Sequence, residues 1–296
     1  MPGSSQSVYT TRRAEFRKIH RALKRDPWLR KRTPVVFCEG DSWFSTPLSM
    51  NLLDWLVYPT PEEERRGVPI VGRGGLFFRA ENSGDLAIDI FKPRRFNDLM
   101  RWYDSVDFDI ALLSAGGNDF VGTFLKTTFA RKGAMTPQAA YDFLRTTTTR
   151  FEDVRDAYAF ALGRMVSLRP KTPIIGHTYA YPLRMGVPAD LTIANLGALA
   201  LLKDNAGPWI GPQMARVLPT IEAQRAFAAL LIDGFVEHVL QPLANDRRFR
   251  GRFRYIDLRE GVPRVEDWFD EMHPTGAAFH RLSKPFAQAI EDLFTL

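Results

Sequence analysis

The chain has 296 residues, 45% of them hydrophobic and 25% charged, as is ordinary for a globular protein with a sizeable core. It has no run of about 18 apolar residues and no apolar N-terminal stretch, so we expect neither a transmembrane helix nor a secretory signal. A single cysteine, Cys38, excludes an internal disulfide. These features favour a cytoplasmic location, while export without a cleaved signal stays open.

The net charge of +6 is concentrated at the N-terminus. Residues 1–34 hold ten basic and two acidic residues, a net charge of +8, whereas the rest of the chain carries −2. Phe16, Ile19 and Leu23 share one face of a predicted helix in this segment. We therefore expect a basic N-terminal arm, residues 1–33, followed by a main domain, residues 34–296. The arm helix either packs on the domain through its apolar face or contacts an anionic surface, such as lipid, nucleic acid or an acidic partner.

Five apolar runs alternate with helical stretches along the main domain. The expected strands are residues 34–39, 75–82, 108–117, 172–180 and 253–258. Helical periodicity is clear in residues 150–169, 220–243 and 276–294. This alternation predicts an α/β domain with a mostly parallel sheet.

Two long stretches fit this alternation poorly, residues 119–149 and 181–219. Loops of this length in a compact domain are usually functional or carry structure of their own. The second stretch is rich in Ala, Leu, Gly and Pro and includes an expected apolar helix from Leu191 to Leu202. We interpret it either as a lid or wall of a substrate pocket or as an extra helix that covers the sheet.

Candidate functional residues follow three of the expected strands, and two more precede the last helix. Ser42 follows the first strand, Gly84 the second and Asn118 the third, while Asp270 and His273 come just before the final helix. Ligands of an open parallel sheet bind at the carboxyl ends of its strands. We therefore expect these residues to gather at one edge of the sheet.

The types of these residues complement one another. A serine hydroxyl such as that of Ser42 becomes a nucleophile when a base takes its proton, and His273 has a suitable pKa for that role. Asp270, three residues earlier, is placed to orient the imidazole. Attack on an acyl carbonyl creates an oxyanion, for which the backbone N–H groups of Ser42 and Gly84 and the Asn118 amide are candidate donors.

These blocks, in this order, resemble the SGNH hydrolases, also called the GDSL esterase/lipase family. The matching residues are Gly40-Asp41-Ser42, Gly84, Gly116-Gly117-Asn118-Asp119 and Asp270-x-x-His273-Pro274. The resemblance implies a three-layer α/β/α sandwich with a five-stranded, mostly parallel sheet. It also implies ester hydrolysis through an acyl-serine intermediate, with no metal and no cofactor.

The sequence departs from the family pattern beside the serine. Trp43 stands where a leucine usually follows the serine, and Phe44 comes next, so we expect these two aromatic rings to shape the substrate pocket. The G-x-S-x-G elbow of the α/β-hydrolases is absent, which argues against that fold.

Several other residues of reactive type receive structural interpretations. We expect Asp267 to be a turn or cap residue, His177 a structural histidine rather than a second base, and Cys38 an inert core thiol. Asp119 either braces the loop that carries Asn118 or is an acidic residue at the N-terminus of a helix. No histidine lies in a cluster with metal-ligand spacing, so no metal site is expected.

The sequence thus predicts a serine ester hydrolase that acts on a small-molecule or lipid ester. One alternative is a deacetylase of acetylated glycans, which would use the same residues. The other is a catalytically silent binding protein on this fold, recruited through its basic arm. The complete set of reactive residues disfavours the silent protein.

Overall fold

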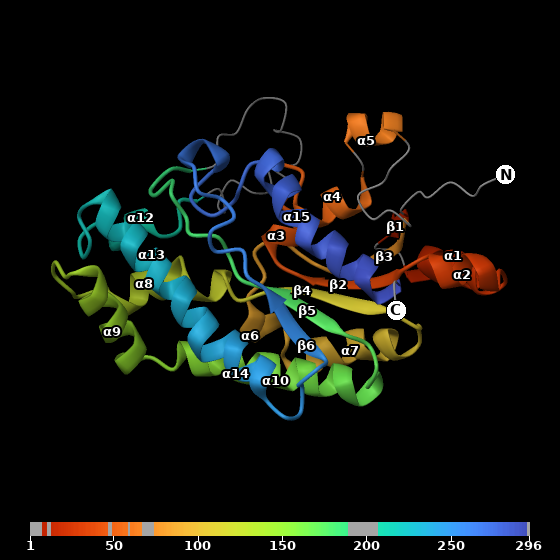
Figure 1. Cartoon of the computed structure of the whole chain (residues 1–296). Coiled ribbons are helices and arrows are strands. Elements are labelled where there is room, and N and C mark those ends of the chain that lie inside the picture. Colours follow the sequence, from red (N-terminus) through yellow and green to blue (C-terminus); the bar gives the residue numbers. More distant parts are fainter. Residues whose placement is uncertain are drawn as a thin grey trace.

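The structure is a computed structural model that describes residues 8–10, 13–46, 49–58, 60–66, 74–188 and 207–294. A parallel sheet of six strands runs through its centre (Figure 1). In spatial order the strands are β1 (Val8–Thr10), β3 (Leu76–Arg79), β2 (Val35–Gly40), β4 (Ile110–Ser114), β5 (Ile174–His177) and β6 (Phe253–Ile256).

All five expected strands are present and parallel, and β1 is an additional edge strand. The four inner strands β3, β2, β4 and β5 are buried along their whole length, which agrees with their unbroken apolar runs. The three residues of β1 are too few to show the apolar pattern of a strand. They pair with Leu76–Phe78 of β3.

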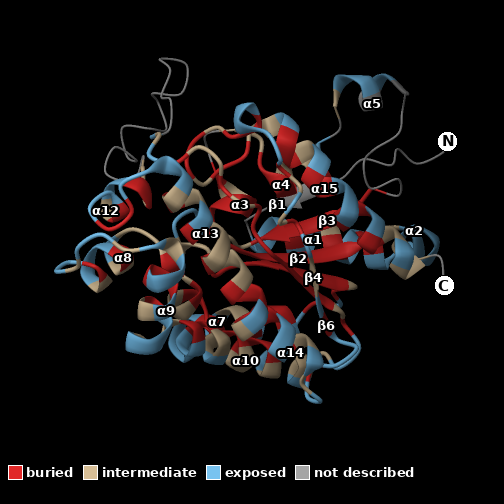
Figure 2. Ribbon diagram, turned by 60° about the vertical axis from the view of Figure 1, so that its left-hand side comes forward, coloured by how far each residue is buried: buried red, intermediate tan, exposed pale blue. Residues whose placement is uncertain are grey.

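Helices cover both faces of the sheet, so the fold has three layers (Figures 1 and 2). The helices on one face are α3 (Ser42–Ser45), α4 (Leu52–Val57) and α15 (Gly276–Glu291). The helices on the other face are α6 (Ala87–Ile90), α7 (Pro93–Asp104), α10 (Arg150–Leu168) and α14 (Gln241–Asn245). The burial colours of Figure 2 show the core between these layers.

The stretch 119–149, which the strand–helix alternation left unassigned, is helical. It forms a short helical turn at Asn118–Phe120, then α8 (Thr123–Thr128) and α9 (Pro137–Thr147). Thr136 caps α9 by accepting a hydrogen bond from the Ala139 N–H, and Pro137 occupies the first turn, where a missing N–H costs nothing.

The chain beyond β5 is described in part. The expected helix Leu191–Leu202 lies outside the described residues, and α12 (Gly211–Met214) precedes α13 (Ile221–Phe235). Helix α13 continues through a π-helical turn, Val236–Leu240, into α14. By length and composition this run, Ile221–Asn245, is apolar enough to cross a membrane, and half of its most apolar window is buried within the protein. The remaining short elements are α5 (Pro61–Arg66) and the helical turns Val265–Asp267 and Asp292–Phe294.

The described part of the basic arm packs on the domain. Its helices are α1 (Arg13–Lys24) and α2 (Pro27–Arg32). The Phe16 ring is completely buried and meets Phe78, Trp102 and Phe108 edge-on or tilted at centroid distances of 5.3–5.8 Å. Leu23 is buried as well, and Ile19 packs beside the same core.

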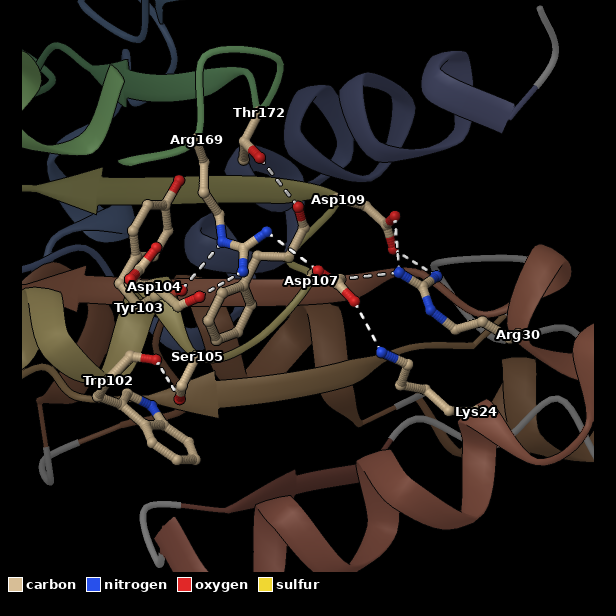
Figure 3. Close-up of polar contacts among 11 residues, drawn as sticks. Lys24, Arg30, Trp102, Tyr103, Asp104, Ser105, Asp107, Asp109, Arg169 and Thr172 are labelled. Atoms are coloured by element: carbon tan, nitrogen blue, oxygen red, sulfur yellow. Dashed lines mark hydrogen bonds and ion pairs between the residues drawn. The ribbon is translucent and has the colours of Figure 1, made fainter. Parts of the chain in front are cut away.

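Ion pairs join the arm to the start of β4 (Figure 3). The Arg30 guanidinium donates to both carboxylate oxygens of Asp109 at 2.9 and 3.0 Å. Asp107 accepts from Lys24 at 2.9 Å and from Arg169 at 3.1 Å. The two-pronged Arg30 contact is the geometry in which a partly exposed ion pair contributes most. Lys24 and Arg30 are thus held at the amino end of the sheet.

Candidate active site

Ser42, His273 and Asp270 form a chain of hydrogen bonds at the carboxyl edge of the sheet. The Ser42 Oγ lies 2.8 Å from Nε2 of His273, and Nδ1 of His273 lies 2.8 Å from Oδ2 of Asp270. The buried carboxylate can only accept, so Nδ1 carries the ring proton and Nε2 accepts from the serine hydroxyl. The structure therefore brings together three residues separated by up to 231 positions.

The end of β2 positions Ser42. The serine is the first residue of α3, and the Asp41 carboxylate accepts the Trp43 N–H at 3.0 Å to begin that helix. Gly40 is required by close packing, since a Cβ there would lie 2.2 Å from the Ser114 carbonyl oxygen on β4. The close pairing of Gly40 on β2 with Ser114 on β4 thus fixes the turn that presents the hydroxyl.

A turn locked by Asp270 positions His273. Besides the imidazole, Oδ1 of Asp270 accepts the N–H groups of Met272 and His273 at 2.7 and 2.8 Å. The Trp43 indole N–H donates to the Met272 carbonyl at 3.1 Å and so ties the serine side of the site to the histidine side. The carboxylate is completely buried, and these hydrogen bonds fix both its rotamer and the tautomer of the ring.

The candidate oxyanion donors lie on neighbouring loops. The Asn118 side-chain amide donates to the Asp85 carbonyl at 3.0 Å, which joins its loop to the turn that contains the exposed Gly84. The Ser42 N–H is the first of α3 and therefore lacks a partner within the helix. The Asn118 NH₂ group has two hydrogens, and the one that does not bond to Asp85 is available to an oxyanion.

Asp119 joins these two loops through hydrogen bonds. Its buried carboxylate accepts the Ala87 and Ile88 N–H groups at 2.7 and 3.2 Å, so it anchors the start of α6 beside Asn118. Burial raises the pKa of Asp119 to about 7. The hydrogen bonds to Ala87 and Ile88 thus make Asp119 both a brace between the loops and an acid at the N-terminus of a helix, α6.

Asp41 makes a buried network that the sequence did not reveal. Its carboxylate accepts from the hydroxyls of Ser114 at 2.7 Å and Tyr179 at 2.5 Å, in addition to the Trp43 N–H. Burial raises the pKa of Asp41, and these hydrogen bonds oppose the rise. The network links the ends of β2, β4 and β5 directly beneath Ser42.

The remaining titratable candidates do not join the hydrogen-bond chain. His177 stacks on the Trp43 ring at 5.5 Å, and its Nδ1 lies 2.7 Å from the Thr178 carbonyl. Burial lowers the pKa of His177 to about 4, so the ring is neutral near pH 7. Asp267 pairs with Arg264 and Arg281 at 2.9 and 2.6 Å, and burial raises the pKa of the Cys38 thiol well above its usual value.

An apolar cavity opens beside the hydrogen-bond chain. The space between its walls, together with the open solvent at its mouth, amounts to about 530 Å³. The neighbours of the candidate site that line it are Trp43, Gly116, Gly117 and Met272. The rest of its wall includes Phe120, Tyr179, Pro182, Ile210, Leu231, Phe235 and Trp268. Pro182 and Ile210 belong to the expected pocket segment, residues 181–219. Within the described ranges, no group of three or more His, Cys, Asp or Glu residues could hold a metal ion.

The fold resembles that of a solved extracellular lipase, and the scores for two further structures are slightly lower. An extracellular lipase from Streptomyces rimosus superposes with a TM-score of 0.50 at 13% identity, covering 87% of this chain and 100% of that chain. A lipase, Lip_vut3, from a goat rumen metagenome gives 0.49 at 11% identity, covering 87% and 97%. Phospholipase A1 from Streptomyces albidoflavus NA297 gives 0.48 at 14% identity, covering 87% and 99%.

Comparisons of the sequence identify no relative of this chain. No protein-family model matches the chain, and no curated protein matches its sequence. At 13% identity the likeness to the Streptomyces rimosus lipase concerns the fold alone. The three-layer α/β fold implied by the resemblance to SGNH hydrolases is thereby confirmed, with one strand more than expected.

Proposed function

We propose that the protein is a serine ester hydrolase that acts through an acyl-serine intermediate. The observation that carries the proposal is the hydrogen-bond chain from Ser42 through His273 to Asp270, with both contacts to the imidazole at 2.8 Å. Its elements are a nucleophile, a base and a carboxylate that orients the base. The likeness of the fold to a bacterial lipase supports the same class of reaction.

The reaction begins when the Ser42 Oγ attacks the ester carbonyl carbon and its proton passes to His273 Nε2. The carbonyl oxygen becomes an oxyanion, and Asp270 stabilises the imidazolium that has formed. When the tetrahedral intermediate collapses, the bond to the alcohol oxygen breaks and Nε2 returns its proton to that oxygen. Water then attacks the acyl-serine by the same route, which releases the acid and restores Ser42.

Donors to the oxyanion come from the loops around Ser42. We assign this role to the N–H groups of Ser42 and Gly84 and to the Asn118 amide. The hydrogen bond from Asn118 to Asp85 supports the assignment because it fixes the amide beside the Gly84 turn before substrate arrives. Preorganised donors of this kind stabilise charge that develops only in the transition state.

The apolar cavity favours an ester with a hydrophobic acyl group. Its wall includes Trp43 and Met272, the residues next to the nucleophile and the base, so an acyl chain on Ser42 would extend into it. The apolar character of this wall favours a hydrophobic acyl group over the acetyl group that a deacetylase of glycans would remove. The intact hydrogen-bond chain likewise argues against a silent binding protein.

Covalent labelling tests this proposal. A fluorophosphonate probe should label the wild-type protein, and Ser42→Ala should abolish the labelling. Ser45→Ala is the matched control, because Ser45 lies on the same helix and its hydroxyl donates to the Asp41 carbonyl, away from His273. Labelling that persists in Ser42→Ala, or that disappears in Ser45→Ala, would contradict the assignment of the nucleophile.

A further inference from the structure

Glu271 is a second buried acid in the segment that carries the proposed base, and the proposed reaction does not use it. It lies between Asp270 and His273 and is fully buried. A buried carboxylate is costly unless its oxygens are hydrogen-bonded. Its contacts therefore indicate what it does.

Four backbone N–H groups bind the Glu271 carboxylate. Oε1 accepts from Gly186 at 2.8 Å and from Gly211 at 2.7 Å. Oε2 accepts from Trp209 and Ile210, each at 2.5 Å. The backbone N–H of Glu271 also donates to the Val187 carbonyl at 3.2 Å. Two segments far from Glu271 in the sequence, 186–187 and 209–211, thus meet around one side chain.

The packing around this carboxylate leaves no room for a side chain at position 211. A Cβ at Gly211 would lie 2.7 Å from the Gly186 Cα and 3.0 Å from Glu271 Oε1. Real Cβ atoms essentially never approach another atom to 2.7 Å. The glycine at position 211 is therefore needed for the two segments to close on the carboxylate.

The residues held by Glu271 form part of the candidate active site. The Trp209 ring lies edge-on to the His273 imidazole, with centroids 5.5 Å apart at 81°. Ile210 lines the apolar cavity. The Trp209 carbonyl accepts the Gly122 N–H at 2.9 Å, so its peptide is fixed from both sides.

Given the proposed hydrolase reaction at Ser42, we propose that Glu271 is a positioning residue for it. The carboxylate docks Trp209 and Ile210 against the segment that carries His273. The indole then restricts the imidazole to the rotamer that meets Ser42, and Ile210 completes the wall of the acyl cavity. Two anionic oxygens suit four donors, whereas a glutamine would turn its NH₂ group toward two of them.

The test compares Glu271→Gln with Glu266→Gln in the full chain. Glu266 is an exposed glutamate five positions earlier, so it controls for the loss of one negative charge. Trp209→Ala is a second variant that keeps all four backbone donors and removes the indole from His273. Trp209→Phe retains an aromatic edge there and should restore most of the rate.

Two readouts separate positioning from activity. The first is acrylamide quenching of Trp209 fluorescence, obtained as the difference between each protein and its Trp209→Phe counterpart, because the chain has six tryptophans. The second is the rate of fluorophosphonate labelling at Ser42, together with kcat and KM for p-nitrophenyl esters of graded chain length. Only the second readout depends on the proposed function.

In Glu271→Gln we expect stronger quenching of Trp209, a weaker preference for long acyl chains, and labelling that is slower by about tenfold to a hundredfold, as for a misplaced catalytic group. Trp209→Ala should show a similar loss of labelling rate, which tests the inference even if Glu271→Gln fails to fold. Glu266→Gln should match the wild type in both readouts.

Unchanged quenching in folded Glu271→Gln would overturn the docking of Trp209. Stronger quenching with an unchanged labelling rate and chain-length preference would overturn the role in catalysis, as would a normal rate in Trp209→Ala. A wild-type protein that reacts with neither the probe nor any ester would instead refute the proposed function. Quenching would then decide the docking on its own.

Discussion

Asp270→Asn should impair the reaction through the tautomer of His273 rather than through the fold. Oδ1 of Asp270 accepts two backbone N–H groups and lies 3.0 Å from the imidazole Nδ1, whereas Oδ2 contacts Nδ1 alone, at 2.8 Å. An asparagine keeps its oxygen toward the two backbone donors, so its NH₂ group replaces Oδ2, the oxygen nearer to Nδ1. The ring then carries its proton on Nε2 and cannot accept the proton of Ser42.

The expected loss in kcat is about 10⁴-fold, the size known for this substitution in a serine protease, which corresponds to about 5.4 kcal/mol in the activation barrier. Steady-state hydrolysis of a p-nitrophenyl ester measures it, with a melting curve to show that the fold persists. Asp267→Asn is the matched control, since Asp267 lies three residues earlier and pairs with Arg264 and Arg281 instead. A fall of less than tenfold in Asp270→Asn, in a protein whose Ser42→Ala variant is inactive, would refute the reasoning.

Four further outcomes follow from the same contacts. Asn118→Ala should lower kcat by about 10²–10³-fold with little change in KM; steady-state kinetics on the same ester measure both. Phe16→Ala should cost about 3–5 kcal/mol of unfolding free energy in a denaturant titration, because the ring is completely buried. The elevated pKa of Asp119, about 7 against 3.8, favours folding most below pH 4, and that advantage disappears as the pH rises to 7. The unfolding free energy of the wild type should therefore fall more between pH 4 and 8 than that of Asp119→Asn. Contact of the arm with an anionic surface stays a prediction, tested by sedimentation with anionic vesicles at low and high salt.

The sequence predicted the sheet well because inner parallel strands must be apolar on both faces. The runs around Phe37, Leu112 and Ile175 are of this kind. The edge strand Val8–Thr10 has no such pattern. Helices α8 and α9 were missed because, at 6 and 11 residues, they show fewer turns of helical pattern than the 19-residue α10. The packing of the arm through Phe16, Ile19 and Leu23 followed from their helical spacing and is confirmed.

The candidate site was predictable where it depends on short motifs at strand ends. Ser42, Asp270 and His273 were found in this way, and the structure joins them by hydrogen bonds. The contacts of Asp41 with Tyr179 and of Glu271 with Trp209 were missed. They connect residues 138 and 62 positions apart, and no local spacing encodes such meetings.

The central claim is that an acyl group is transferred to Ser42. The most direct test is rapid quenching of the protein with p-nitrophenyl octanoate in acid, followed by mass spectrometry of its peptides. We predict an octanoyl adduct on the peptide that contains Ser42, formed together with a burst of p-nitrophenol and absent in Ser42→Ala. An adduct on a different residue, or steady hydrolysis by the Ser42→Ala variant at the wild-type rate, would contradict the claim.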